Sequence, residues 1–166
     1  LQECERTPWR EALVGTVQKS SKQSALLEYV ARPCRAAWWP LLNLQPRWRV
    51  LDLGCGWGAI TFGLAPYVAS VVACDLDPER LRFLKVRAVQ DGVSNVQLLC
   101  AGDTSPLPFA DQEFDLVVLS GVLALTPVFK SGSPIALQRE FLREVGRVLS
   151  PEGQLLLADR NRWSLR

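Results

Sequence analysis

Short apolar runs alternate with amphipathic stretches along the chain from residue 49 onward. An apolar run of about four to eight residues predicts a buried strand, and apolar positions three or four apart predict a helix. The expected strands are 49–53, 70–75, 96–100, 114–119 and 154–158. The expected helices are 59–66, 79–90 with Pro78 in its first turn, and 134–149. This alternation predicts an α/β fold with a parallel sheet between two layers of helices.

The first 48 residues give a weaker pattern. Residues 21–32 predict a helix that Pro33 ends, and residues 35–44 predict a second, short helix that contains Trp38 and Trp39. Paired tryptophans pack a helix onto a sheet more often than they cover a pocket, so we expect packing here. The chain therefore divides into a helical N-terminal extension, residues 1–46, and a sheet domain, residues 47–166.

Two local patterns give further expectations. The helix 79–90 carries four basic residues that we expect on a solvated face: Arg80, Arg82, Lys85 and Arg87. The sequence Ser-Pro-Glu-Gly at 150–153 has proline second and glycine fourth, which is typical of a β-turn before the last strand.

Composition narrows the class of protein. A length of 166 residues fits one domain, and a net charge of +2 gives no argument for a nucleic-acid partner. No apolar stretch approaches the roughly 18 uncharged residues of a membrane helix, and no signal-peptide pattern opens the chain. Five cysteines without a C-x-x-C pair favour free thiols and a reducing, cytoplasmic setting. The absence of histidine removes the commonest general base and most zinc sites, so no metal is expected.

The strand 49–53 runs directly into a glycine-rich loop, Gly54-Cys55-Gly56-Trp57-Gly58. Glycine lacks a Cβ, so it adopts positive φ and lets a ligand approach the backbone. The helix that follows adds backbone N–H groups and a positive partial charge at its start. A strand, a glycine loop and a helix in this order form a ligand crevice at the carboxyl edge of an open α/β sheet.

Three acids stand at equivalent places on successive strands: Asp52 just before the glycines, Asp75 at the end of the second strand, and Asp103 after the third. In a parallel sheet these ends meet at one edge, where a carboxylate can accept hydrogen bonds from a ribose diol or an exocyclic amine. Each feature alone has a plainer explanation: a simple turn at the glycines, a helix cap at Asp75, an Asx turn at Asp103. Together they predict a site for an adenosine-bearing ligand.

The glycine spacing distinguishes between adenosine ligands. The dinucleotide fingerprint is G-x-G-x-x-G, but here the third glycine comes one residue early, and no P-loop lysine motif is present. The sequence 52–58 resembles the first motif of the class I S-adenosylmethionine-dependent methyltransferases. Residues 72–75, 102–109, 114–118 and 143–153 are similar to later motifs of that family, so the resemblance runs from about 48 to 160.

This resemblance implies a Rossmann-like three-layer sandwich with strand order 3-2-1-4-5 and S-adenosylmethionine as cofactor. The loop Gly54, Cys55, Gly56 and Gly58 would lie against the methionine part, with Asp52 near its ammonium. On the nucleoside side, Asp75 would hold the ribose hydroxyls, Leu76 would pack on the adenine, and Asp103 with Thr104 would face the adenine amine. Ser120 and Gly121 would border the transferred methyl group. No residue is nominated as a catalytic base.

The chain departs from the family in two ways. The usual sheet has two further strands, whereas this sequence stops after the fifth, which we interpret as a truncation. That would leave strand five as an edge for a second copy or a partner chain to cover. The loop at 120–123 also lacks the Asn/Asp-Pro-Pro-Tyr/Phe motif of enzymes that methylate amino groups of DNA bases and glutamine.

The expected acceptor is a small molecule or a glycan or lipid intermediate rather than nucleic acid. Two other functions stay open: a non-catalytic scaffold or regulatory module with this fold, and a nicotinamide-dependent oxidoreductase, which the early third glycine disfavours.

Overall fold

The computed structural model describes residues 5–12, 37–101, 106–124 and 132–159. Its centre is a parallel sheet of five strands in the order β3-β2-β1-β4-β5, as expected. The strands are β1 (Arg49–Leu53), β2 (Ser70–Asp75), β3 (Val96–Cys100), β4 (Phe114–Ser120) and β5 (Leu149–Ala158). The first three have the bounds that the apolar runs predict, and β4 is one residue longer.

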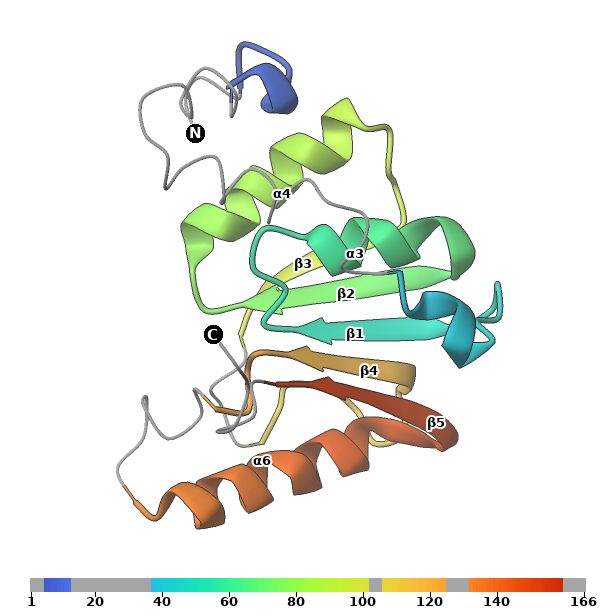
Figure 1. The fold of residues 1–166 in the computed structure, drawn as a ribbon, viewed down its shortest axis with the longest axis vertical. Helices are drawn as coiled ribbons and strands as arrows, with labels where there is room; N and C mark the ends of the chain where they lie inside the picture. The colour runs from blue at the N-terminus through green and yellow to red at the C-terminus, as the bar shows by residue number, and fades with distance from the viewer. Residues whose placement is uncertain (1–4, 13–36, 102–105, 125–131, 160–166) are drawn as a thin grey trace.

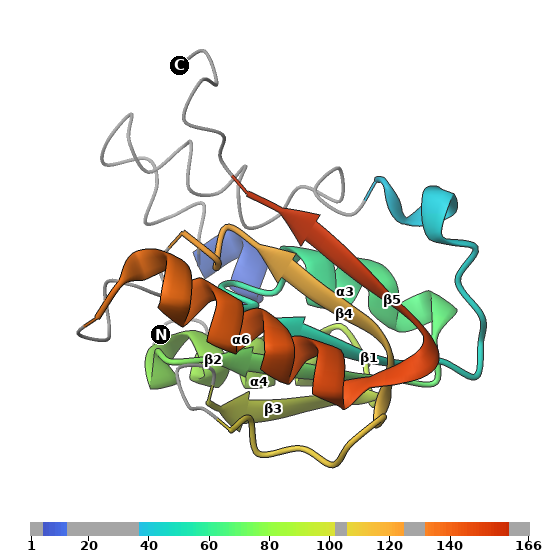
Figure 2. The ribbon, with the colours of Figure 1, turned by 90° about the horizontal axis from the view of Figure 1, so that it is seen from below.

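Helices cover both faces of this sheet, which confirms the three-layer Rossmann-like fold (Figures 1 and 2). On one face lie α3 (Ala59–Leu64), continued by the 3₁₀ turn η3 (Ala65–Tyr67), and α4 (Pro78–Gln90). On the other lies α6 (Pro134–Val148). The helix predicted over 59–66 is therefore shorter as an α-helix, because its last turn, which contains Pro66, tightens to 3₁₀ geometry.

The core is continuous through the middle of the sheet. Side chains of β1 and β4 alternate between the two faces, and both faces are buried, as the nearly unbroken apolar runs predict. The face toward α6 contains Leu51, Leu53, Val117 and Leu119, and the face toward α3 contains Val50, Leu116 and Val118. The carboxyl ends of β1, β2 and β4 are thereby held rigidly at one edge.

The last strand differs from the prediction. We expected a turn at 150–153, but β5 runs unbroken from Leu149 to Ala158. The four residues form an irregularity within the ladder, since Phe114 pairs with Leu149 while Leu116 pairs with Gln154. Pro151 is tolerated because β5 lies at the edge of the described sheet, where one side of the strand has no ladder partner.

Residues 5–12, which we call the N-terminal segment, lie against α4 (Figure 1). They form one helical turn at 9–12 and bury Trp9. The predicted helix 21–32 lies outside the described residues. Of the predicted helix 35–44, the structure describes residues 37–44, in which the only helical part is the 3₁₀ turn η2 (Trp39–Leu42).

The paired tryptophans Trp38 and Trp39 pack beside the core cluster under α3, as we predicted. Trp39 stacks on Tyr67 with ring centres 4.1 Å apart. Tyr67 precedes β2, so this stack lies at the amino ends of the strands, opposite the glycine loop. Among the helices of the described residues, none is long and apolar enough to cross a membrane.

Candidate functional site

The loop after β1 is built on three glycines with left-handed backbone. Gly54, Gly56 and Gly58 have φ values of 72°, 55° and 76°. The amides of Gly54 and Cys55 both donate to the carbonyl of Cys74 on the neighbouring strand, at 2.8 and 2.9 Å. The loop is therefore anchored to β2 before it turns into α3.

The three glycines face different surroundings. A Cβ on Gly54 would overlap the side chain of Val122, and one on Gly58 would lie 2.9 Å from the ring of Phe62. A Cβ on Gly56 would meet no heavy atom within 4 Å. A side chain at position 54 or 58 would therefore clash with neighbouring side chains, whereas Gly56 presents its backbone to open space.

Asp75, at the end of β2, is tied to the loop. Its Oδ2 accepts a 2.8 Å hydrogen bond from the Gly56 amide, and its Oδ1 accepts one from the Asp77 amide at 3.0 Å. Arg80 Nη1 lies 3.5 Å from the same Oδ2. The alternative of Asp75 as a helix cap is wrong, because the side chain that caps α4 is Asp77, which accepts from the Glu79 amide.

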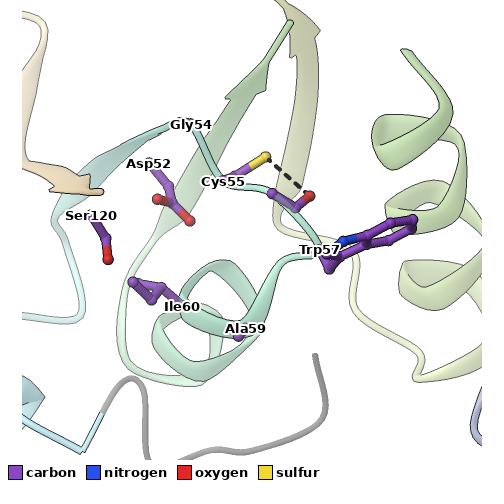
Figure 3. Close-up of a pocket in the computed structure, with 8 residues that line it drawn as sticks. Asp52, Gly54, Cys55, Trp57, Ala59, Ile60 and Ser120 are labelled. Atoms are coloured by element: carbon purple, nitrogen blue, oxygen red, sulfur yellow. Dashed lines mark hydrogen bonds between the residues drawn. The ribbon is translucent and has the colours of Figure 1, made fainter. Parts of the chain in front are cut away.

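Asp52 lies at the bottom of a small pocket beside this loop. It is 1% exposed, and the hydroxyl of Thr61 on α3 donates to its Oδ2 at 2.6 Å. The pocket is lined by Asp52, Gly54, Cys55, Gly56, Trp57, Ala59, Ile60 and Ser120. In Figure 3 the side chains of Asp52, Ile60 and Ser120 converge, while the Trp57 indole points away from them.

The two acids give this edge a negative field. Burial and, after it, the charges of Asp52 and Asp75 together raise the pKa of the Cys74 thiol to about 12. The pKa of Cys55 is also raised by burial, then by the same two carboxylates. Both thiols therefore stay protonated at neutral pH and are poor nucleophiles. A pocket with this field suits a ligand that carries positive charge.

A family model described as a methyltransferase domain matches residues 51–157, which include the loop, both acids and all strands after β1. The chain belongs to the methyltransferase-domain family. The match confirms the resemblance found in the motifs and covers most of the sheet domain.

Individual methyltransferases are also similar to this chain in sequence or in structure. The demethylmenaquinone methyltransferase of Corynebacterium efficiens is 36% identical over 118 residues, covering 71% of this chain and 44% of that protein. The solved structure of YcgJ from Bacillus subtilis matches with a TM-score of 0.60 and 28% identity over 70% of this chain and 45% of that one. A SAM-dependent methyltransferase from Methanosarcina mazei gives 0.59 and 29%, over 70% of this chain and 54% of that one. The chain thus spans about half of each relative's length or less.

The site residues predicted for this methyltransferase domain lie at the expected edge where the structure describes them. Leu76 is 39% exposed beside Asp75, so its side chain is accessible at this edge of the sheet. Ser120 ends β4 and lines the pocket, and Gly121 follows with a φ of 72°. Asp103 and Thr104 lie outside the described residues.

Sequence reasoning missed three residues near the site. Thr61 holds Asp52, Arg80 faces Asp75, and Arg87 lies close to the loop. The prediction that Arg87 lies on a solvated face is wrong, because its side chain is only 9% exposed. Thr61 had a usable signal, since it is a polar residue in the first turn of a helix that is otherwise apolar.

Proposed function

We propose that this methyltransferase domain binds S-adenosylmethionine at the carboxyl edge of its sheet and transfers the methyl group to a small organic acceptor. The observation that carries the proposal is the relation of Asp52 and Asp75 to the loop between them: each acid ends or nearly ends a strand, and Gly56 presents open backbone beside both. A dinucleotide is disfavoured by the early third glycine.

The residues present fit the charges and groups of this cofactor. The carboxylate of Asp52 lines the pocket and suits the ammonium of the methionine part, since a carboxylate accepts strong hydrogen bonds from a cationic donor. The backbone at Gly56 allows close approach. Asp75 keeps acceptor capacity for ribose hydroxyls, because each carboxylate oxygen accepts two hydrogen bonds and the Arg80 contact at 3.5 Å is long. Asp103 and Thr104 are proposed for the adenine amine, and Leu76 for the adenine ring.

The chemistry follows from the bound cofactor, which supplies a methyl group on a positively charged sulfur. The protein's part is to hold that group and the acceptor in line and to exclude water, which lowers the entropic cost of the displacement. Ser120 and Gly121 border the place where the two would meet. A base is required only where the acceptor must lose a proton early, and because this chain has no histidine we propose an Asp, Glu, Lys or Tyr side chain or the acceptor itself for that role.

We propose a small-molecule, glycan or lipid acceptor rather than nucleic acid. The net charge of +2 gives no argument for binding a phosphate backbone. The Corynebacterium relative is named for demethylmenaquinone, which supports a small organic acceptor. The reducing, cytoplasmic setting stays a prediction from the cysteines.

Calorimetric titration tests the cofactor. S-adenosylmethionine and S-adenosylhomocysteine are titrated into the wild-type chain, Asp75→Ala and Glu152→Gln, with NADH as a competing ligand. Glu152→Gln is the control, because it also removes one negative charge but lies exposed on β5. We expect Asp75→Ala to weaken binding by about 1–3 kcal/mol, the cost of an unpaired polar group, and Glu152→Gln to leave it unchanged. No binding by the folded wild type, or preference for NADH, contradicts the proposal.

A further inference from the structure

The N-terminal segment is attached to α4 between Arg82 and Gln90. At one end Glu5 Oε1 accepts from Arg82 Nη2 at 2.8 Å. At the other, Gln90 makes two bonds: its Oε1 accepts from the Trp9 amide at 2.7 Å, and its Nε2 donates to the Thr7 carbonyl at 3.2 Å. These contacts join residues some 80 positions apart in the sequence, so the segment is a specific part of the fold.

Trp9 is the centre of this attachment. It is 2% exposed, its indole N–H donates to Asp91 Oδ1 at 3.0 Å, and its ring meets Phe83 edge-on with centres 5.9 Å apart. The guanidinium carbon of Arg87 lies 4.4 Å from the centre of the same ring. The guanidinium carbon of Arg10 lies 4.5 Å from the centre of this ring, so the buried indole holds both arginines, and of the two it is Arg87 that reaches the loop.

Arg87 lies between two aromatic rings. Its guanidinium carbon is 4.4 Å from the centre of Trp9 and 4.3 Å from that of Phe62. Its Nε pairs with Asp91 Oδ2 at 3.4 Å, and Nη1 donates to the carbonyl of Trp57 at 3.4 Å. Burial lowers the pKa of Arg87, and Asp91 opposes that shift. The guanidinium is thus a buried cation with specific partners. Burial of a charge costs free energy of folding, which argues for a role beyond packing.

Both sides of the Trp57–Gly58 peptide depend on these contacts. Arg87 holds the Trp57 carbonyl, and the Phe62 ring on which Arg87 lies is the group that a Cβ on Gly58 would touch at 2.9 Å. Gly58 has a φ of 76°, in a region that glycine adopts about as readily as negative φ. The contacts around Gly58 therefore determine its conformation. One side chain from α4 therefore braces the last part of the glycine loop.

We propose that Arg87 is a positioning residue for the cofactor loop, and that the N-terminal segment keeps it in place through Trp9. The segment is linked to the loop through Phe83 and Arg87, and it controls how rigidly the loop is held. The consequence for cofactor affinity rests on the proposed function, whereas the bracing of the loop does not.

Hydrogen exchange on the whole chain tests the bracing. Arg87→Met keeps the length of the side chain but removes its charge and donors, and Arg87→Lys restores only the charge. We expect faster exchange at the Gly56 and Gly58 amides in Arg87→Met, with partial rescue in Arg87→Lys and unchanged protection in β4. Lys85→Gln is the control, because Lys85 is exposed on the same helix and the variant removes a positive charge without breaking a contact between α4 and the N-terminal segment.

Trp9→Phe is a second, milder variant that keeps the test valid where Arg87→Met fails to fold. It keeps an aromatic ring over Arg87 but loses the hydrogen bond to Asp91. We expect it to fold and to increase loop exchange less than Arg87→Met does. In the folded variants, the dissociation constant of S-adenosylhomocysteine should rise about threefold to thirtyfold for Arg87→Met, the range that a buried cation–π contact supports, and stay constant for Lys85→Gln.

These measurements distinguish a failure of the cofactor proposal from a failure of the proposed role of Arg87. A wild type that does not bind S-adenosylhomocysteine contradicts the cofactor, and the exchange data then decide the bracing alone. Loop exchange in Arg87→Met that matches wild type, or that rises equally in β4, overturns the role of Arg87.

Discussion

The amide of Gly56 donates a 2.8 Å hydrogen bond to Oδ2 of Asp75, which joins the middle of the glycine loop to the acid on the neighbouring strand. The two features that the sequence marks separately are therefore one unit. Any ligand that contacts the carboxylate also contacts the loop, and a change in either should affect both stability and binding.

Replacement of Gly56 by alanine separates backbone strain from ligand contact. Gly56 has a φ of 55°, and a Cβ there meets nothing, so the cost to folding is strain alone, about 1–2 kcal/mol. Gly92 is a matched control, with a φ of 67° and equally open surroundings at the end of α4. We expect similar losses of unfolding free energy in urea for both variants, but weaker S-adenosylhomocysteine binding only for Gly56→Ala. Equal affinities would show that the ligand does not approach this glycine.

Thr61 supports Asp52 from α3, and both residues are almost fully buried. Thr61→Val keeps the shape of the side chain but removes the hydroxyl that donates at 2.6 Å to Oδ2. The expected loss of stability is about 1–3 kcal/mol, because a buried carboxylate loses a hydrogen-bond donor. Thr61→Ser retains the hydroxyl and should recover most of it. Chemical denaturation of the three proteins measures the difference, and a Thr61→Val variant as stable as wild type contradicts this role.

Arg147 and Glu144 on α6 hold the connection before β4. Arg147 donates to the carbonyls of Leu107 and Phe109, each at 2.9 Å, and Glu144 Oε2 accepts from the Leu107 amide at 2.8 Å. The hydrogen bond from Arg147, then that from Leu107, lowers the pKa of Glu144 in the folded chain. The ionised form therefore stabilises the fold at pH values above the ordinary carboxyl range, and this contribution disappears as pH falls through the lowered value.

We therefore expect Glu144→Gln to be less stable than wild type at neutral pH, with the difference shrinking in acid. Urea denaturation at several pH values measures it. Glu140→Gln is the control, because Glu140 is exposed on the same helix. A difference that stays constant or grows toward low pH contradicts the assigned direction of the pKa shift.

The thiols at the site should differ in reactivity. The raised pKa values of Cys55 and Cys74 keep them protonated in mildly alkaline buffer, whereas Cys100 is exposed. Among these three, we expect iodoacetamide to modify Cys100 first, and urea to equalise the rates. Peptide mass spectrometry over time measures each site. Rapid modification of Cys55 in the folded chain is the result that contradicts the buried, negatively charged surroundings.

The fold was largely predictable because the apolar runs of central parallel strands are unambiguous. Strand β5 was only partly predictable, since Ser150–Gly153 has a strong turn sequence that an edge strand nevertheless accommodates as an irregularity. The glycines and Asp75 indicated from the sequence where the candidate site lies. The residues that hold them in place could not be recognised from the sequence. Arg87 follows a pattern typical of a solvated basic face, and only the long-range contact with Trp9 makes it buried. Such contacts depend on tertiary structure rather than on local periodicity.

We propose that the glycine loop and Asp75 together bind S-adenosylmethionine. The most direct measurement is the hydrogen exchange of the wild-type chain with and without saturating S-adenosylhomocysteine. We predict added protection in the peptides that contain Gly54–Gly58 and Asp75–Asp77, and none at the amino ends of β1 and β4. Protection confined to other parts of the chain, or no change at all, would contradict it.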